Sequence, residues 1–335
     1  MQAVSAEPTP TRALSLSAIR SPVEAELKEF RRYFRGAMRS RVRLLDAIIQ
    51  YLLRQKGKQI RPLLVLLSAK ASGRVDESTY RAAALVELLH TATLVHDDVV
   101  DDSDKRRGLY SIKALWKNRV AVLVGDFLLS RGLLLALRYK DYELLQVVSE
   151  AVRRMSEGEL LQIEKARKLD INEETYFRII SDKTASLIAS CTQCGATSAN
   201  ADPETRERMR LFGEKLGIAF QIRDDLFDYG QVDVGKPLGL DVKDKKMTLP
   251  LIHALEKAPG PERKKIMKLI RRNRKKPSEV RTILDFVESH EGTAYARASM
   301  EKYAGEALEL LHDLPDSDAL DALRRLVAYT ISRSR

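Results

Sequence analysis

Apolar residues recur every three or four positions along nearly the whole chain, which is the period of an α-helix. Ala83, Val86 and Leu89 follow this step in segment 76–98, and the segment 120–139 is apolar over most of its circumference. A helix that is apolar on most sides belongs inside a large bundle. No segment shows the alternation typical of a β-strand. The sequence therefore predicts an all-α protein, a single large helical bundle.

The same period predicts helices over most of the remaining chain. They are expected at about residues 23–54, 60–71, 142–167, 173–199, 204–228, 247–257, 263–272, 277–290, 293–312 and 317–332. A chain of 335 residues with 44% hydrophobic content can bury one large core. We expect a flexible N-terminal segment over residues 1–22 and a single helical domain over residues 23–335.

Two features bear on the compartment. No window approaches the roughly 18 to 20 consecutive apolar residues of a membrane span, and the first residues lack a basic end that leads into an apolar stretch. A cytoplasmic protein is expected. The C-x-x-C pair Cys191 and Cys194 has no second cysteine pair and no nearby histidine to complete a zinc site, so both are expected in a helical core.

The net charge of +11 is concentrated in one place. Between Pro261 and Arg281 there are ten Lys or Arg residues and two acidic residues, a local charge of +8. This patch has no interleaved aromatic residues and no recognisable nucleic-acid module, so nucleic acid is not expected as a partner. A solvated helix and turn, or a surface for an anionic partner, are the two interpretations that remain.

Two acidic clusters of identical spacing carry the strongest functional signal. DDVVD spans Asp97, Asp98 and Asp101, DDLFD spans Asp224, Asp225 and Asp228, and each ends an apolar helical run. Carboxylates at positions i and i+4 share one face of a helix. Because Mg²⁺ prefers oxygen ligands and binds through one or two carboxylates plus substrate phosphates, two facing clusters would hold several ions that bridge a diphosphate.

Basic residues stand where a diphosphate site would need them. Arginine forks match phosphate oxygens, and lysine supplies a point charge. Such residues precede a predicted helix, follow the first acidic cluster, lie in the segment DKTAS beside Thr184, and occupy the loop after the second cluster. They are Lys58, Arg61, Arg106, Arg107, Lys183, Lys236 and Lys246.

At these motifs the chain resembles the trans-polyprenyl diphosphate synthases of the polyprenyl synthetase family, from about residue 25 to the C-terminus. The two signatures read LVHDDVVDDSDKRRG and FQIRDDLFDYGQVDVGKPLGLDVKDKKMTLP. The resemblance implies a helical bundle with a central apolar cavity, usually a homodimer, with the aspartate motifs on opposite walls of its mouth. It also implies head-to-tail condensation of isopentenyl diphosphate with an allylic diphosphate, assisted by three Mg²⁺ ions.

The resemblance assigns a role to each matching residue. Asp97 and Asp101 would bind two ions and Asp224 the third, with Asp98, Asp225 and Asp228 in or near the metal coordination. The isopentenyl diphosphate would be held by Lys58, Arg61, His90 and Arg107. The allylic diphosphate would be held by Arg106, Lys183, Lys236 and Lys246, with Thr184 and Gln221 beside the allylic carbon.

Product length is expected to depend on the helix that ends in Asp97. In the family, bulky aromatic residues four or five positions before the first aspartate stop chain growth early, but here these positions are Ala92 and Thr93. The opposing wall is expected from residues 127–139. We expect a farnesyl or geranylgeranyl primer and a product longer than C20, such as C30 to C40, as in the heptaprenyl and octaprenyl diphosphate synthases. Release of so apolar a product suggests peripheral membrane contact.

Departures and alternatives also follow from the sequence. The family usually has Gly-Lys before TLP, where this chain has Lys245 and Lys246, and often Gly-Gly-Lys where it has Lys56, Gly57 and Lys58. A geranylgeranyl or farnesyl diphosphate synthase is one alternative. Others are a non-catalytic subunit of a two-chain synthase and an HD-type metal phosphohydrolase built on the pair His96 and Asp97.

Overall fold

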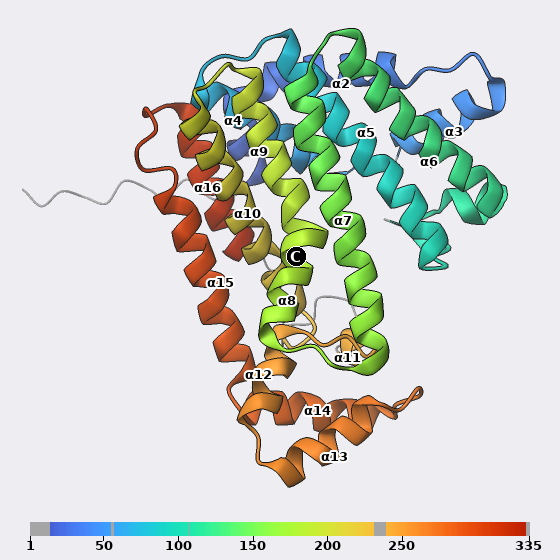
Figure 1. Ribbon diagram of the computed structural model, residues 1–335, viewed down its shortest axis with the longest axis vertical. Helices are drawn as coiled ribbons and strands as arrows, with labels where there is room; N and C mark the ends of the chain where they lie inside the picture. The colour runs from blue at the N-terminus through green and yellow to red at the C-terminus, as the bar shows by residue number, and fades with distance from the viewer. Residues whose placement is uncertain (1–13, 55–56, 107, 231–238, 333–335) are drawn as a thin grey trace, which may run out of the picture.

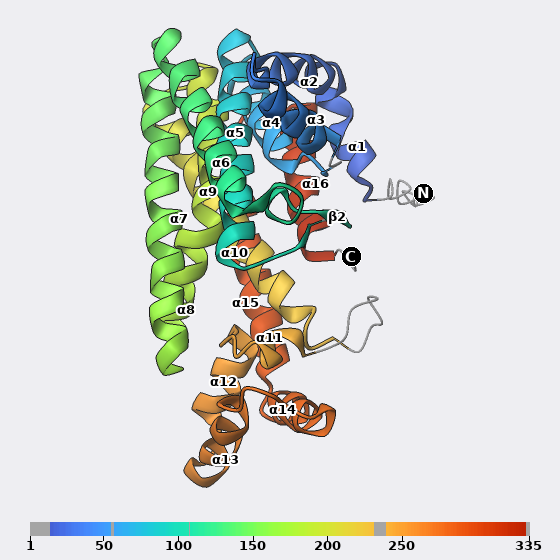
Figure 2. The ribbon, with the colours of Figure 1, turned by 90° about the vertical axis from the view of Figure 1, so that its right-hand side faces the viewer.

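The computed structural model describes residues 14–54, 57–106, 108–230 and 239–332. Within these ranges the chain is mostly helical, which confirms the predicted fold class. Long helices run roughly along the long axis of the molecule, and α12 to α14 form its lower end (Figure 1). In the perpendicular view, α7 and α8 form one side of the bundle and α1 to α3 lie on the other (Figure 2).

The N-terminal half holds the helices that build one side of the site. Its elements are α1 (Leu16–Arg20), η1 (Ser21–Val23), α2 (Glu24–Met38), α3 (Arg43–Arg54), α4 (Ile60–Ser72), α5 (Glu77–Val100), β1 (Lys105–Arg106), β2 (Leu109–Tyr110), α6 (Ile112–Arg138) and α7 (Tyr142–Lys168).

The C-terminal half supplies the other side and the lower end. Its elements are α8 (Glu173–Ile180), η2 (Ser181–Ala185), α9 (Ser186–Ser198), α10 (Pro203–Leu226), α11 (Leu240–Lys243), α12 (Leu249–Lys257), α13 (Gly260–Ile270), α14 (Pro277–Ser289), α15 (Gly292–Glu309) and α16 (Asp318–Ser332).

The central helix is α9, which contacts α4, α5, α7 and α10. Its sequence, SLIASCTQCGATS, consists mostly of small residues, so neighbouring backbones approach closely on all sides. Cys191 and Cys194 are buried there, as expected from the sequence. Burial raises the pKa of the Cys191 thiol to about 12, so this thiol stays protonated at neutral pH.

The two helices that carry the aspartate motifs begin with strong caps. Asp76 accepts a hydrogen bond from the Thr79 backbone N–H at 3.2 Å in a capping box at the start of α5. Asp202 accepts one from the Thr205 N–H at 2.9 Å, with Pro203 as the first residue of α10. An N-terminal oxygen acceptor satisfies an N–H group that otherwise lacks a partner. These caps define where each helix begins, and each helix then runs for 24 residues to its aspartate motif.

The N-terminal region differs from the prediction in two ways. The helix expected over residues 23–54 is two helices, α2 and α3. The segment expected to be flexible includes α1 and η1, because Ile19 and Val23 are fully buried and these elements contact α16. An isolated helix of five residues is unstable in water, so this tertiary burial is what orders it.

Two further details were not predicted. A two-stranded antiparallel hairpin pairs Lys105 with Tyr110 and Arg106 with Leu109, immediately after the first aspartate motif. The helix expected over residues 173–199 contains a π-helical turn, η2, between α8 and α9. Turns of this kind are rare in proteins as a whole, and those that occur often lie at functional sites.

Helix α6 is long and apolar enough to cross a membrane by length and composition, with 33% of its most apolar window buried. The expectation that no segment approaches a membrane span is therefore wrong by this measure. Charged residues interrupt the apolar run, which is why a count of consecutive apolar residues missed it. The helix packs on α5 and α7 with one face and leaves the opposite face exposed.

Candidate active site

The first aspartate motif closes the C-terminal end of α5, and its members differ in environment. Asp98 is buried and accepts a hydrogen bond from Arg106 Nε at 2.7 Å. Asp97 is half-buried and Asp101 is exposed, and neither forms an ion pair within the described part of the chain. Burial raises the pKa of the Asp97 carboxyl, and the carboxylates of Glu159 and Asp101 raise it further. The charges of Lys183 and Arg106 offset only part of this effect, and the negative charge that remains favours binding of a cation.

The second motif, at the end of α10, has the same division. Asp224 is exposed, while Asp225 is buried and accepts hydrogen bonds from Tyr176 Oη at 2.7 Å and Gln221 Nε2 at 3.0 Å. Burial raises the pKa of Asp225 to about 7, against the lowering effect of these two bonds. Asp228 accepts the backbone N–H groups of Leu240 at 2.7 Å and Asp241 at 3.0 Å, so it anchors α11.

The two motifs therefore have an outer and an inner set of carboxylates. The inner set, Asp98, Asp225 and Asp228, is buried and accepts hydrogen bonds from protein groups, and the outer set, Asp97, Asp101 and Asp224, is half-buried or exposed. Within the described residues, no three His, Cys, Asp or Glu side chains already form a metal-ligating group. This fits an ion that takes one or two carboxylates from the protein and its remaining ligands from substrate phosphate and water. The outer carboxylates suit a hard cation such as Mg²⁺.

The π-helical turn η2 connects the two motifs. Lys183 Nζ lies 2.5 Å from Glu159 Oε2 and 3.3 Å from Gln162 Oε1, and the Lys183 charge also acts on Asp97. The next residue, Thr184, donates a hydrogen bond to Gln221 Oε1 at 3.0 Å. Since Gln221 in turn donates a hydrogen bond to Asp225, Thr184 is linked to the second motif, while Lys183 acts on the first motif through its charge.

Half-buried charged residues on α7 and α10 hold η2 in place. Arg154 lies 2.8 Å from both Asp182 and Glu214, and Ser181 donates a hydrogen bond to Glu214 at 2.8 Å. Burial alone would raise the pKa of Glu214, but hydrogen bonds from Arg154, Ser181 and Arg210 outweigh it and bring the pKa to about 2. This network keeps the turn, and with it Lys183, in one position.

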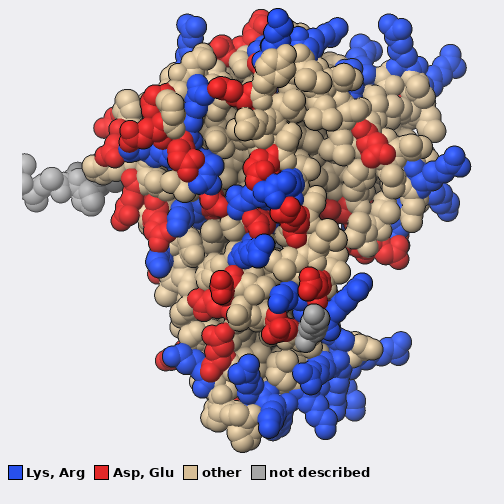
Figure 3. Space-filling view, viewed as in Figure 1, with Lys and Arg blue, Asp and Glu red and all other residues tan. Residues whose placement is uncertain are grey.

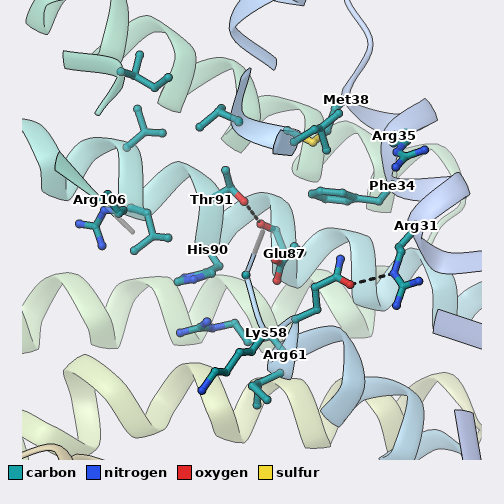
Figure 4. A pocket seen from close by; sticks show the side chains of 18 of the residues that line it. Arg31, Phe34, Arg35, Met38, Lys58, Arg61, Glu87, His90, Thr91 and Arg106 are labelled. Atoms are coloured by element: carbon teal, nitrogen blue, oxygen red, sulfur yellow. Dashed lines mark hydrogen bonds between the residues drawn. The ribbon is translucent and has the colours of Figure 1, made fainter. Parts of the chain in front are cut away.

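A cavity of about 490 Å³ lies beside α5 and is lined mainly by residues of α2, α3, α4 and α5 (Figure 4). Four of its cationic or imidazole groups are residues assigned from the sequence, and apolar side chains of α2 and α3 close its far end. The assigned residues are Lys58, Arg61, His90 and Arg106. Arg106 was expected with Lys183 at the allylic diphosphate, but it pairs with Asp98 and faces this cavity.

Sequence reasoning missed three arginines of this cavity. Arg31 donates a hydrogen bond to Gln59 Oε1 at 3.0 Å, Arg20 donates one to the carbonyl oxygen of Lys58, and Arg35 also lines the wall. The spacing of Arg31 and Arg35 places them on one face of a helix. Their spacing alone does not reveal which element this helix contacts.

The remaining assigned residues fall into two groups. Lys246 Nζ lies 2.9 Å from Asp241 Oδ1 on α11, so it is on the side of the second motif. Its pKa is lowered by burial, but the bond to Asp241 raises it overall, so the side chain stays charged. Arg107 and Lys236 lie outside the described residues, as does Lys56.

The positions expected to set product length also differ from one another. Ala92 has no exposed surface, so its methyl group contacts protein rather than open space. Thr93 is half-buried, lies four residues before Asp97 on the same helical face, and donates a hydrogen bond to the His90 carbonyl at 2.9 Å. Thr93 is therefore better placed than Ala92 to influence product length.

The expected opposing wall is only partly correct. A Cβ on Gly132 of α6 would lie 3.2 Å from Leu85 Cδ1, so α6 packs directly on α5 there. Leu133, Leu134 and Leu137 are exposed and point away from α5. The helical period explains the error, because an all-round apolar helix does not reveal which of its faces meets a neighbour.

His96 does not form the metal pair that an HD-type phosphohydrolase needs. Its Nε2 lies 3.2 Å from the Val122 carbonyl oxygen and 3.5 Å from Asp126 Oδ1, both on α6. The imidazole also rests on Gly125, where a Cβ would lie 2.1 Å from Nε2. The His96 side chain therefore packs between α5 and α6 beside the first motif.

Comparison with known proteins agrees with this geometry. The family described as Polyprenyl synthetase matches residues 42–287. The octaprenyl diphosphate synthase of Escherichia coli (strain K12) is 36% identical over 300 residues, covering 89% of this chain and 93% of that protein. A short chain isoprenyl diphosphate synthase of Methanothermobacter thermautotrophicus is 34% identical over 290 residues, covering 85% and 89%.

A solved structure gives the same result for the fold. The polyprenyl synthase from Caulobacter crescentus CB15, complexed with calcium and isoprenyl diphosphate, superposes with a TM-score of 0.87 at 32% identity. The match covers 97% of this chain and 100% of that one.

Gly158 of α7 is predicted to be required for the position of Lys183. A Cβ there would lie 2.8 Å from the Lys183 backbone nitrogen and 2.9 Å from Asp182 Cβ. Gly158→Ala should therefore displace η2, cost about 1 to 3 kcal/mol of stability, and weaken Mg²⁺-dependent binding of inorganic diphosphate by about tenfold or more. Thermal unfolding and calorimetry measure the two effects.

Gly305→Ala is the matched control, because nothing lies within 4 Å of the added Cβ on α15. It should leave diphosphate binding unchanged and stabilise the helix by about 0.5 to 1 kcal/mol. If the two variants behave alike, Gly158 has no special role in placing η2.

Proposed function

The chain belongs to the polyprenyl synthetase family and is a prenyltransferase, and we propose that it condenses isopentenyl diphosphate with a farnesyl or geranylgeranyl primer to give trans-polyprenyl diphosphates longer than C20. The observation that carries this proposal is the η2 arrangement, in which the Lys183 charge acts on the first aspartate motif and Thr184 is hydrogen-bonded through Gln221 to the second. The cationic cavity on the other side of α5 supports it, because two diphosphate substrates need two separate sites.

The outer carboxylates Asp97, Asp101 and Asp224 are proposed to hold Mg²⁺, with three ions per site. When bound, these ions supply positive charge against the diphosphate that leaves the allylic carbon. The chain itself adds the Lys183 ammonium on the same side. Asp98, Asp225 and Asp228 keep the outer carboxylates in position through their contacts with Arg106, Tyr176 and α11.

The second substrate is proposed to bind in the 490 Å³ cavity. Lys58, Arg61 and His90 would hold its diphosphate, and Arg31 and Arg35 would add positive charge to the wall. The hydroxyl and amide dipoles of Thr184 and Gln221 would lie beside the allylic cation as it forms. A C2 proton of the isopentenyl unit is lost after the new carbon–carbon bond forms, and the released diphosphate is the base at hand.

The reaction is tested by incubating the protein with Mg²⁺, isopentenyl diphosphate and farnesyl diphosphate, followed by chromatography of the products. We expect longer prenyl diphosphates and loss of activity on chelation. Asp97→Asn and Asp224→Asn should each lower kcat by about 10²- to 10³-fold or more, since charge stabilisation of the leaving group is lost. Asp316→Asn, a control at an exposed ion pair, should not. Full activity in either motif variant would contradict the metal assignment.

A product longer than C20 is proposed because no aromatic residue precedes the first motif until Tyr80, seventeen residues before Asp97. This is roughly 25 Å of helix at about 1.5 Å per residue. The similarity to both octaprenyl and short chain synthases at about 35% identity leaves this length to experiment.

Thr93→Phe should shorten the products to about C15 to C20 while condensation continues, because the ring would occupy the space directly behind Asp97. Product chromatography measures the shift, and Thr282→Phe on the exposed face of α14 is the control. A wild-type enzyme that stops at C20, or a Thr93→Phe variant with unchanged products, would show that this helix face does not set the length.

We also propose that the protein is a homodimer through α6. Five exposed apolar residues of this helix fall within a sector of about 120°, at 100° per residue. They are Val122, Leu123, Leu133, Leu134 and Leu137. Asp126 and Ser130 lie in the same sector, but most of its exposed surface is apolar, which is typical of a subunit interface.

Sedimentation velocity tests the dimer. The wild-type chain should sediment as a dimer, and Leu123→Glu combined with Leu134→Glu should give monomers, because two charges would be buried without partners. Leu308→Glu, at an exposed position of α15, should leave the dimer intact. A monomeric wild-type protein would refute the proposal.

A further inference from the structure

A strongly charged surface lies outside the two aspartate motifs, on α13 and the turn that follows it. Lys and Arg side chains gather at this lower end of the molecule (Figure 3). Six of them are exposed and form no ion pair among the described residues: Arg263, Lys264, Lys265, Lys268, Arg271 and Arg274. We refer to these six residues as the basic surface.

The basic surface has the form of an amphipathic helix. Ile266 and Ile270 of α13 are buried against the protein. At 100° per residue, Lys264, Lys265, Lys268 and Arg271 lie within a sector of about 120° on the opposite side. The charges therefore point outward together, away from the bundle.

The basic surface lacks the carboxylate partners that some other cationic side chains of this protein have. The exposed Arg153 is bound by Glu150 and Glu157, and the half-buried Arg208 is bound by Glu204 and Asp313. On the basic surface the like charges repel one another without compensation. An external anion would relieve this repulsion.

The basic surface adjoins the mouth of the active site. Lys245 Nζ lies 2.5 Å from Asn273 Oδ1 and Lys275 Nζ lies 3.4 Å from the Lys243 carbonyl, so the turn after α13 is bonded to the segment around α11. That segment is held by Asp228 of the second motif. A partner bound to α13 would therefore lie close to the end of the bundle that carries the aspartate motifs.

We propose that the basic surface docks the protein on membranes that contain acidic phospholipids. Clusters of four to eight Lys or Arg residues on an amphipathic helix bind anionic lipid headgroups. Nucleic acid fits less well, because residues 260–281 contain no aromatic side chain that could stack on a base. The use of this docking rests on the proposed function: a product with a hydrocarbon tail longer than C20 leaves the protein beside a bilayer that can receive it.

The test is sedimentation of the full-length protein with lipid vesicles, without substrate or Mg²⁺, so that it does not depend on catalysis. We expect binding to phosphatidylcholine vesicles that contain about a third phosphatidylglycerol, none to pure phosphatidylcholine, and a loss of binding as salt is raised. Lys264, Lys265, Lys268 and Arg271 all changed to Gln should weaken binding by about 100-fold. Thermal unfolding verifies that this variant is folded.

The matched control removes four positive charges elsewhere. Lys28, Arg39, Arg41 and Arg43 are exposed on α2, at the start of α3 and in the connection between them. Changing these four to Gln gives the same net charge and should leave vesicle binding within about twofold of wild type. Equal loss in both variants would show that total charge, not the basic surface, drives binding, and this result would overturn the proposal.

Two other outcomes would also overturn it. One is failure of the wild-type protein to bind acidic vesicles at low salt. The other is an α13 variant that binds vesicles normally but has a raised KM for isopentenyl diphosphate in solution, which would assign the basic surface to attraction of small diphosphates.

Discussion

The site depends on the π-helical turn η2, which inserts one charged and one hydroxyl side chain between two clusters of carboxylates. Lys183 Nζ, 2.5 Å from Glu159, carries positive charge to the first motif, and Thr184 contacts Gln221 beside the second. A regular α-helix through residues 181–185 would rotate one of these side chains away. The turn is possible because Gly158 leaves room for it and because Arg154, Asp182 and Glu214 fix its outer side.

The carboxylates of the two motifs are not equivalent, and the difference explains how so much acid is held in one place. Asp98, Asp225 and Asp228 accept hydrogen bonds from Arg106, Tyr176, Gln221 and the start of α11. These bonds offset the cost of burial. Asp97 accepts no such hydrogen bond among the described residues; burial raises its pKa, and the charges of Lys183 and Arg106 offset only part of the rise. The protein therefore retains an attraction for cations at the outer carboxylates, where a substrate diphosphate can share them.

Much of this was predictable from the sequence. Helical periodicity predicted the fold class, and the two DDxxD motifs predicted where the acidic helix ends lie, because both signals are local. Contacts between distant segments were not predictable. Arg31 and Arg35 reach the cavity only because α2 folds beside α5. The solvent-facing side of α6 could not be predicted because the helix is apolar on nearly every side. The π-turn was missed because DKTAS is an ordinary helical sequence, and its insertion is imposed by packing against Gly158.

The central claim is that the aspartate motifs hold an allylic diphosphate only through divalent ions. The most direct test is calorimetric titration of the protein with a farnesyl diphosphate analogue in which sulfur replaces the bridging oxygen at C1, so that no bond breaks. With Mg²⁺ present, the analogue should bind tightly to the wild-type protein, and without Mg²⁺ the six carboxylates should repel it. Equal affinity with and without Mg²⁺ would contradict the account.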